Sequence, residues 1–273
     1  MRPSFIVRSG TVETEGDTIY YEVRGQGPPL LMISGGGGDA GFYTFVADIL
    51  AGDYKVITYD RRGNSRSSRN DPQSFEISQQ SRDAVAVLRA AGETSAFILG
   101  NSGGAIIGLD LAKSHPQVVR MLVAHEPPAI GVLPDSEQWR RFFARLDRMA
   151  FRFGTNLAML RFALSVKIPW RAYRAVPHDV ALRVGRNHDF FMKHEMLAFT
   201  NYTPDVAAIR RNGVKTVMAA GSTTLAAGKY YGRTAPILAE MLGCEMMAFP
   251  GHHISYVDAP QPWAATLRGV LIR

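Results

Sequence analysis

The sequence predicts an α/β protein, with a mostly parallel central sheet, helices on both of its faces and a helical block inserted between two strands. Short apolar runs alternate with helical patterns along most of the 273 residues, as is typical of such a sheet. The alternation stops in segment 130–204, where helical stretches rich in aromatic residues and methionine replace the strand-like runs. The 46% of hydrophobic residues suffices for one sizeable core. We therefore expect a core made of residues 1–129 and 205–273, covered by a helical lid at 130–204.

The composition argues against several classes of protein. No apolar run reaches the roughly 18 residues that a membrane-spanning helix needs, and MRPSFIVRSG lacks the apolar stretch of a secretory signal. A single cysteine, Cys244, precludes an internal disulfide framework. The net charge is +7, but like charges form no block and no basic-aromatic RNA-binding motif is visible. We expect a cytoplasmic protein that binds neither nucleic acid nor membranes and uses no metal or cofactor, and the sequence leaves a homodimer open.

Five elements are expected before residue 95. The pattern of Thr11–Gly25 predicts an antiparallel hairpin that turns at Gly16-Asp17. The continuous apolar run at 30–33 is typical of a central parallel strand, and residues 54–59 form the next strand. Residues 77–91 have helical periodicity, and the glycine that follows them closes that helix.

The later elements continue the alternation on either side of the inserted block. A strand at 96–99 leads into a helix that ends near His115-Pro116, and another strand follows at 118–123. Within the block, the helical stretches are residues 139–153, 157–164 and 189–199. After it we expect a strand, a helix, a strand and a terminal helix, at residues 214–220, 234–242, 245–249 and from about 262 onward. Pro236 fits the first turn of the helix at 234–242.

The stretch on which the function depends is Ala96–Asp110, read as AFILGNSGGAIIGLD. Its Gly100-to-Gly104 segment fits the G-x-S-x-G pattern of a nucleophile elbow, bracketed by a strand-like run and the start of a helix. The turn is so sharp that residues two before and two after the serine must be nearly free of side chain. Ser102 is therefore the candidate nucleophile, and the alternative is a plain Gly/Ser loop before a helix.

A serine hydroxyl needs a base, and the chain has seven histidines. His115 lies at the far end of the helix that follows Ser102, and His125 precedes a glutamate and has a structural interpretation. Three histidines fall in the inserted block, where a surface or pocket-lining role is the default: His178, His188 and His194. His252 and His253 follow the last strand, where the base should arrive. We favour His253, because of its spacing after Pro-Gly and its apolar neighbours.

The base needs an acid that fixes its tautomer. The usual place is the turn after the strand at 214–220, but residues 221–224 read Gly-Ser-Thr-Thr and hold no carboxylate. The carboxylate at a nearby strand end is Glu126, which two prolines follow and hold rigid, so we assign it as the orienting acid. The alternative is that Glu126 only caps the start of the lid, and Asp258 is the rival acid.

The developing oxyanion needs two backbone N–H donors. Gly103, directly after the candidate nucleophile, gives one. The other is expected from the glycine-rich loop after the third strand, with Gly36 as first choice and Gly35 as second. A glycine-rich loop could instead cradle a phosphate, but no Lys-Ser/Thr follows it and we see no G-x-G-x-x-G with its following helix, so that alternative is weak.

These motifs together resemble those of α/β-hydrolase-fold serine hydrolases over nearly the whole chain, in the order Ser, Glu, His. The segment Asp60–Ser67 is also similar to that superfamily's Asp-x-Arg-Gly-x-Gly-x-Ser turn, with Ser65 in place of a glycine. The departure is the absent acid after the strand at 214–220. Zearalenone-type lactone hydrolases have a similar His-Glu-x-Pro segment that carries the acid, here His125–Pro128. The resemblance implies an ester or lactone substrate without establishing that mycotoxin.

The lid carries most of the excess charge. Segment 130–202 holds twelve Lys or Arg and six Asp or Glu, a surplus of six against the net +7 of the chain. The charges either form a solvated helix face or attract an anionic substrate. Apolar residues interleave with them at helical spacing, and we expect four to wall a pocket above the candidate nucleophile: Trp139, Phe143, Met149 and Phe153.

The sequence thus predicts a cofactor-free serine hydrolase, with Ser102, His253 and Glu126 as triad, that cleaves a bulky apolar carboxylic ester or lactone through an acyl-enzyme. Two alternatives stay open. One is carbon–carbon bond hydrolysis on the same fold, and the other is a ligand-sensing protein on a hydrolase scaffold. Dehalogenase and epoxide hydrolase chemistry are disfavoured, because in the superfamily both need an aspartate where Ser102 stands.

Overall fold

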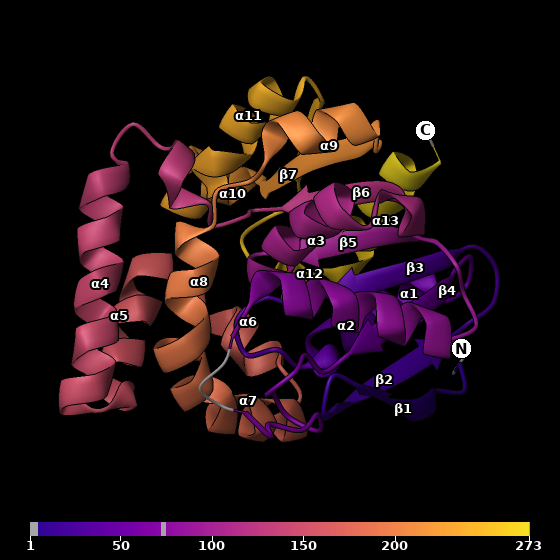
Figure 1. Ribbon diagram of the computed structural model, residues 1–273, viewed down its shortest axis with the longest axis horizontal. Coiled ribbons are helices and arrows are strands. Elements are labelled where there is room, and N and C mark those ends of the chain that lie inside the picture. The colour runs from indigo at the N-terminus through magenta and orange to yellow at the C-terminus, as the bar shows by residue number, and fades with distance from the viewer. Residues whose placement is uncertain (1–4, 72–74, 273) are drawn as a thin grey trace.

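The computed structural model describes residues 5–71 and 75–272 and shows an eight-stranded sheet with helices on both faces (Figure 1). The strand order is β1-β2-β4-β3-β5-β6-β7-β8. β1 is antiparallel to β2 and β2 to β4, and the later neighbouring pairs are parallel. The strands are β1 (Arg8–Thr14), β2 (Asp17–Arg24), β3 (Pro29–Ile33), β4 (Lys55–Tyr59), β5 (Ala96–Asn101), β6 (Val119–His125), β7 (Thr216–Gly221) and β8 (Glu245–Phe249). The predicted fold class is confirmed.

Two apolar clusters separate the helices by face. α2, α3, α9 and α11 contribute to one cluster, and α1, α12 and α13 contribute to the other. The helices outside the inserted block are η1 (Ala40–Tyr43), α1 (Thr44–Leu50), α2 (Ile77–Ala90), α3 (Gly103–Ser114), η2 (Pro116–Val118), α9 (Val206–Asn212), α10 (Ser222–Ala226), α11 (Tyr230–Leu242), α12 (Ser255–Asp258) and α13 (Pro260–Leu271).

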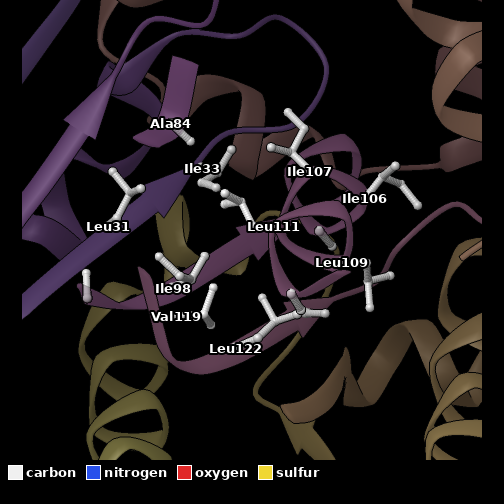
Figure 2. Close-up of a cluster of buried hydrophobic side chains, with 14 of the residues drawn as sticks. Leu31, Ile33, Ala84, Ile98, Ile106, Ile107, Leu109, Leu111, Val119 and Leu122 are labelled. Carbon is white, nitrogen blue, oxygen red and sulfur yellow. The ribbon is translucent and has the colours of Figure 1, made fainter. Parts of the chain in front are cut away.

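The third strand shows why its sequence lacks polar alternation. Leu31 and Ile33 belong to the first cluster, whereas Leu30 and Met32 point to the opposite face and belong to the second. Because helices cover both faces, every position of β3 is buried. Figure 2 shows part of the first cluster, in which side chains of α3 gather against those of β3, β5 and β6. This packing fixes the start of α3, and with it the turn that carries Ser102.

The inserted block lies between β6 and β7. Its helices are η3 (Ile130–Val132), α4 (Ser136–Phe153), α5 (Thr155–Val166), α6 (Trp170–Ala175), α7 (His178–Phe190), the π-helical turn η4 (Phe191–Glu195) and α8 (Met196–Asn201). Figure 1 shows α4 and α5 at one edge of the molecule, with α8 between them and the sheet. A third apolar cluster joins η3, α4, α5, η4 and α8 to the start of α11. No described helix is both long and apolar enough to cross a membrane.

The structure corrects several details of the predicted elements. In the core, the short helices α1, α9, α10 and α12 were not expected. In the insertion, the single helix expected at 189–199 is a continuous path of α7, η4 and α8, and α6 and most of α7 were not expected. The helices α6 and α7 begin directly after a proline, Pro169 or Pro177, which occupies the N-cap position. Pro236 lies inside α11 rather than in its first turn, because the helix begins at Tyr230, where buried tyrosines pack against the insertion.

Candidate active site

Ser102 occupies the predicted strand-to-helix turn between β5 and α3. Its backbone has φ 56° and ψ −122°, a conformation that non-glycine residues rarely adopt and that stores strain. A Cβ on Gly100 would lie 2.2 Å from the carbonyl oxygen of Gly104, and a Cβ on Gly104 would lie 2.0 Å from that of Ile33. The two outer glycines of the motif are therefore required by close backbone contact.

The turn is held by its neighbour strand. The amide of Ser102 donates to the carbonyl of His125 at the end of β6, at 2.8 Å. Gly103 is the first residue of α3, so its N–H has no partner within the helix and lies at the positive end of the helix dipole. The site next to the serine hydroxyl is thus favourable for negative charge.

His253 and Glu126 are joined by a hydrogen bond between Nδ1 of the imidazole and Oε2 of the carboxylate. Glu126 is fully buried, and its backbone has φ 52°, the left-handed region that a glutamate rarely adopts. Its other oxygen, Oε1, accepts the amide of Gly221 at 2.8 Å. The ring of Tyr231 lies 4.5 Å from that of His253 and packs against it. Both carboxylate oxygens are therefore engaged, and the imidazole is fixed on two sides.

The environment keeps Glu126 ionised. Burial by itself raises the pKa of this carboxyl, but the hydrogen bonds from His253 and from the Gly221 amide stabilise the carboxylate, and the net pKa lies below the ordinary value. Gly221 also explains the missing carboxylate after β7. A Cβ there would lie 2.5 Å from the Gly251 carbonyl and 3.2 Å from Oε1 of Glu126, so the glycine leaves room for an acid that arrives from β6.

A buried polar network, which the sequence analysis missed, lies behind the turn. Asn101 donates to Nδ1 of His125 at 2.8 Å and to the backbone carbonyl of His253 at 3.2 Å, and it accepts the hydroxyl of Tyr256 at 3.0 Å. Burial lowers the pKa of His125 to about 4, so its imidazole is neutral at pH 7. The sequence signal that could have identified Asn101 was its position inside the G-x-S-x-G motif. The network connects the serine turn to the backbone of His253.

The rival residues have other partners. Nε2 of His252 contacts Oδ2 of Asp258 at 3.1 Å, and the same oxygen accepts from Arg171 at 2.8 Å. The carboxylate that contacts His253 is that of Glu126, as expected, and Asp258 is engaged elsewhere. His115 caps the far end of α3.

The glycine-rich loop follows β3 and lies against the serine turn. A Cβ on Gly35 would lie 2.7 Å from Cβ of Ser102, and a Cβ on Gly36 would lie 2.7 Å from the ring of Phe191. In the described part of the chain, the amide of Gly36 has no protein acceptor. Both glycines therefore allow a close approach between the loop, the serine and the inserted helices.

Ser65, which stands where the resembled pattern has a glycine, also has a left-handed backbone, with φ 52°. Its amide donates to Oδ1 of Asn187 in α7 at 2.9 Å, and its hydroxyl accepts from Nδ2 of the same side chain at 2.8 Å. These bonds explain how a serine holds a conformation that favours glycine.

Ser102 and His253 line the same cavity, of about 300 Å³, between the sheet edge and the inserted helices. No hydrogen bond joins the two side chains in the described structure, a common situation before substrate binds. A smaller extension of about 30 Å³ continues past Gly103 toward Tyr231. The walls are mainly apolar and come largely from the insertion: Met159, Phe162, Ala163, Val166, Tyr173, Val176, Ala181, Val184, His188 and Phe191.

The four lid residues expected to wall the cavity do not line it. Trp139 and Phe143 pack on Tyr230 in the third cluster, while Met149 and the exposed Phe153 lie in an outer groove between α4 and α5. The insertion lines the cavity with α5, α6, α7 and η4 instead, and α4 packs on the outside of α5 and η4. No lysine or arginine lines the cavity among the described residues, so the basic surplus of the insertion lies outside it. Nor do three described His, Cys, Asp or Glu side chains gather as metal ligands would.

Comparison with known proteins identifies the family. The profile of the alpha/beta hydrolase fold matches residues 28–176. YraK of Bacillus subtilis (strain 168), named as an uncharacterized hydrolase, is 32% identical over 272 residues, covering 97% of this chain and 96% of that protein. The enol-lactonase of Burkholderia xenovorans LB400 has a similar structure, with a TM-score of 0.77 at 17% identity over 97% of this chain and 100% of that one. An alpha/beta hydrolase of Sphaerobacter thermophilus DSM 20745 gives 0.73 at 24% identity over 96% and 100%. The chain therefore belongs to the α/β-hydrolase fold family and is a hydrolase of that fold.

Proposed function

We infer that this hydrolase is a serine enzyme that cleaves a carboxylic ester or lactone with a bulky apolar group, through an acyl-enzyme. The observation that carries the proposal is the set of contacts around one cavity. Ser102 stands on a strained turn in that cavity, His253 lines it, and the buried carboxylate of Glu126 holds Nδ1 of His253. A carboxylate on Nδ1 leaves Nε2 free to accept a proton, which is the requirement for a general base.

The proposed reaction follows from these positions. His253 takes the hydroxyl proton of Ser102 as the oxygen attacks the carbonyl carbon, and the N–H groups of Gly36 and Gly103 bind the oxyanion. The intermediate collapses when the imidazolium protonates the leaving alcohol. Water, activated by the same imidazole, then releases the acid from Ser102. With a lactone, the two steps give one ring-opened hydroxy acid.

The substrate class rests on the cavity. Its apolar walls and volume of about 300 Å³ suit a bulky apolar molecule, and no lysine or arginine of residues 5–71 or 75–272 lines it, which argues against recognition of a carboxylate there. Because the insertion supplies most of these walls, we assign residues 130–204 the role of a lid. The enol-lactonase likeness shows the fold alone, so the lactone alternative depends on the His125–Pro128 segment and its resemblance to zearalenone-type lactone hydrolases. A small-molecule partner, a cytoplasmic location and a homodimer stay predictions.

Labelling of the serine tests the proposal directly. Wild type, Ser102→Ala, His253→Ala and His252→Ala are exposed to a fluorophosphonate and their intact masses are measured. We expect one adduct on wild type and on His252→Ala, whose imidazole contacts Asp258 instead, and none on the other two. No adduct on folded wild type, or an adduct on Ser102→Ala, would contradict the serine mechanism and favour a ligand-sensing role. Steady turnover of esters separates ester hydrolysis from carbon–carbon bond cleavage.

A further inference from the structure

Arg61, which follows β4, is a completely buried cation whose hydrogen-bonding capacity is fully used. Its side chain is 0% exposed, as is that of its partner Glu195. Nη1 and Nη2 bind the two carboxylate oxygens at 2.7 and 2.8 Å. The other three N–H groups donate to Ser34 O at 3.0 Å, to Gly35 O at 2.9 Å and to Gln80 Oε1 at 3.2 Å. A buried charge is tolerated when every donor is satisfied, and only the guanidinium fork offers five donors in this plane.

The two backbone acceptors of Arg61 belong to the loop expected to bind the oxyanion. A carbonyl and the amide of the next residue share one planar trans unit and point in opposite directions. Holding the oxygen of Gly35 therefore fixes the direction of the Gly36 N–H, and holding that of Ser34 fixes the Gly35 N–H. Gly35 O also accepts the Gly38 amide at 3.1 Å. Without such restraints, peptide units between glycines rotate more easily than others.

The inserted helices contact Arg61 and the glycines of the expected oxyanion site from the other side. Glu195 ends the π-helical turn η4, and its Oε1 also accepts from Asn64 at 2.9 Å. Phe191 of the same turn packs on Gly36, while the ring of Phe199 lies against Gly103 and 5.1 Å from the Arg61 guanidinium. One short segment of the insertion thus touches Arg61 and both glycines that carry the expected donors. π-helical turns are frequent at functional sites.

We propose that Arg61, clamped by Glu195 of the insertion, is a positioning residue that holds the Gly36 amide toward the oxyanion; this rests on the proposed serine mechanism. Arg61 does not touch the reacting atoms. It acts through the Ser34 and Gly35 carbonyls, and it makes the oxyanion site dependent on docking of the inserted helices against the core.

The neighbouring Arg62 is a matched control. It is also buried and binds Asp83 and Asp17, but its backbone acceptors, Thr14 and Glu15, lie in the β1–β2 turn far along the chain from the glycine loop. The two arginines are adjacent, and each forms a buried carboxylate contact. Replacing either one perturbs folding, so only a readout specific to the oxyanion separates them.

The test compares Arg61→Lys with Arg62→Lys. It adds the double variant Arg61→Met/Glu195→Leu, which removes both buried charges together and so leaves neither charge buried without its partner. Melting temperature, kcat and KM for p-nitrophenyl butyrate are measured on folded protein. Inhibition by 1,1,1-trifluoro-2-octanone, which forms an oxyanion on the serine, is compared with that by 2-octanone, which binds as a ground-state ketone.

We expect both Arg61 variants to lose roughly 10²-fold in kcat, the effect of one oxyanion donor, with KM within threefold. Affinity for the trifluoromethyl ketone should fall in parallel, and affinity for 2-octanone should not. Arg62→Lys should lower the melting temperature and leave the ratio of the two affinities unchanged. Equal losses of kcat and of trifluoromethyl ketone affinity in Arg61→Lys and Arg62→Lys would overturn the positioning role. Wild-type kcat in a folded Arg61 variant would overturn it as well. A wild type that neither hydrolyses esters nor binds the trifluoromethyl ketone would overturn the serine mechanism itself, and the positioning role with it.

Discussion

Replacing Glu126 by glutamine keeps the size of the side chain but removes one of its two acceptors. In the structure, Oε1 accepts from the Gly221 amide at 2.8 Å and Oε2 accepts from Nδ1 of His253. A glutamine has one oxygen and one NH₂ group. The oxygen can accept from either the Gly221 amide or the His253 ring, and the other group then faces the NH₂, which is itself a donor. If the oxygen faces Gly221, the NH₂ donates to Nδ1 and forces the proton onto Nε2, the tautomer that cannot accept from Ser102. The other orientation leaves a buried amide unsatisfied, at about 1–3 kcal/mol.

The first orientation costs less, so most molecules should hold His253 in the wrong tautomer. By analogy with acid-to-amide changes in other triads, we expect kcat to fall about 10⁴-fold, or roughly 5.5 kcal/mol of transition-state stabilisation. The buried carboxylate is replaced by a neutral isostere, so the fold should persist. Steady-state hydrolysis of p-nitrophenyl butyrate measures the loss, and circular dichroism with thermal melting checks the fold.

The control is Asp258→Asn, which changes the rival acid. Asp258 contacts His252 and Arg171, so that variant should keep kcat within about threefold of wild type. A folded Glu126→Gln enzyme with more than a tenth of wild-type kcat, especially beside an inactive Asp258→Asn, would refute the reasoning and move the orienting acid.

Three further predictions concern stability, the acid and the cavity. Burial lowers the pKa of His125 from 6.5 to about 4, so the unfolded chain takes up a proton at a higher pH than the folded chain does. The free energy of unfolding should therefore be unaffected by this group above pH 6.5 and lower by roughly 3 kcal/mol near pH 4, and urea unfolding across that range measures it. Gly221→Ala places a Cβ 2.5 Å from a backbone carbonyl beside the acid and should lower kcat roughly 10²-fold, whereas Gly185→Ala, in open space, should not. Ala163→Trp puts a bulky ring into the cavity, so the hydrolysis rate for p-nitrophenyl octanoate relative to p-nitrophenyl acetate should fall roughly tenfold. Phe153→Ala, which lies outside the cavity, should leave that ratio unchanged. An unchanged ratio in Ala163→Trp would exclude this cavity as the acyl site.

Local steric rules made much of the architecture readable from the sequence. The alternation of buried strands and helices predicted the parallel sheet, and the spacing of two glycines around Ser102 predicted the sharp turn between β5 and α3. The clash at Gly100 arises within the strand–turn–helix unit itself, whereas Gly104 is required by close contact with the Ile33 carbonyl of the neighbouring strand β3. Because no carboxylate follows β7, the sequence analysis assigned Glu126 as the acid, and the structure shows its contact with His253.

Contacts between distant segments were decided only by the tertiary structure. Arg61 and Glu195 are 134 residues apart, and neither residue type nor spacing marks them as partners. The cavity lining was misjudged for the same reason: helical periodicity shows which face of α4 is apolar but not what that face packs against, and it packs on α5, η4, α8 and the start of α11. Periodicity is a property of one helix, whereas lining a cavity depends on how several helices pack together. The sequence therefore determined the sheet and the serine turn, and packing of the insertion determined what surrounds them.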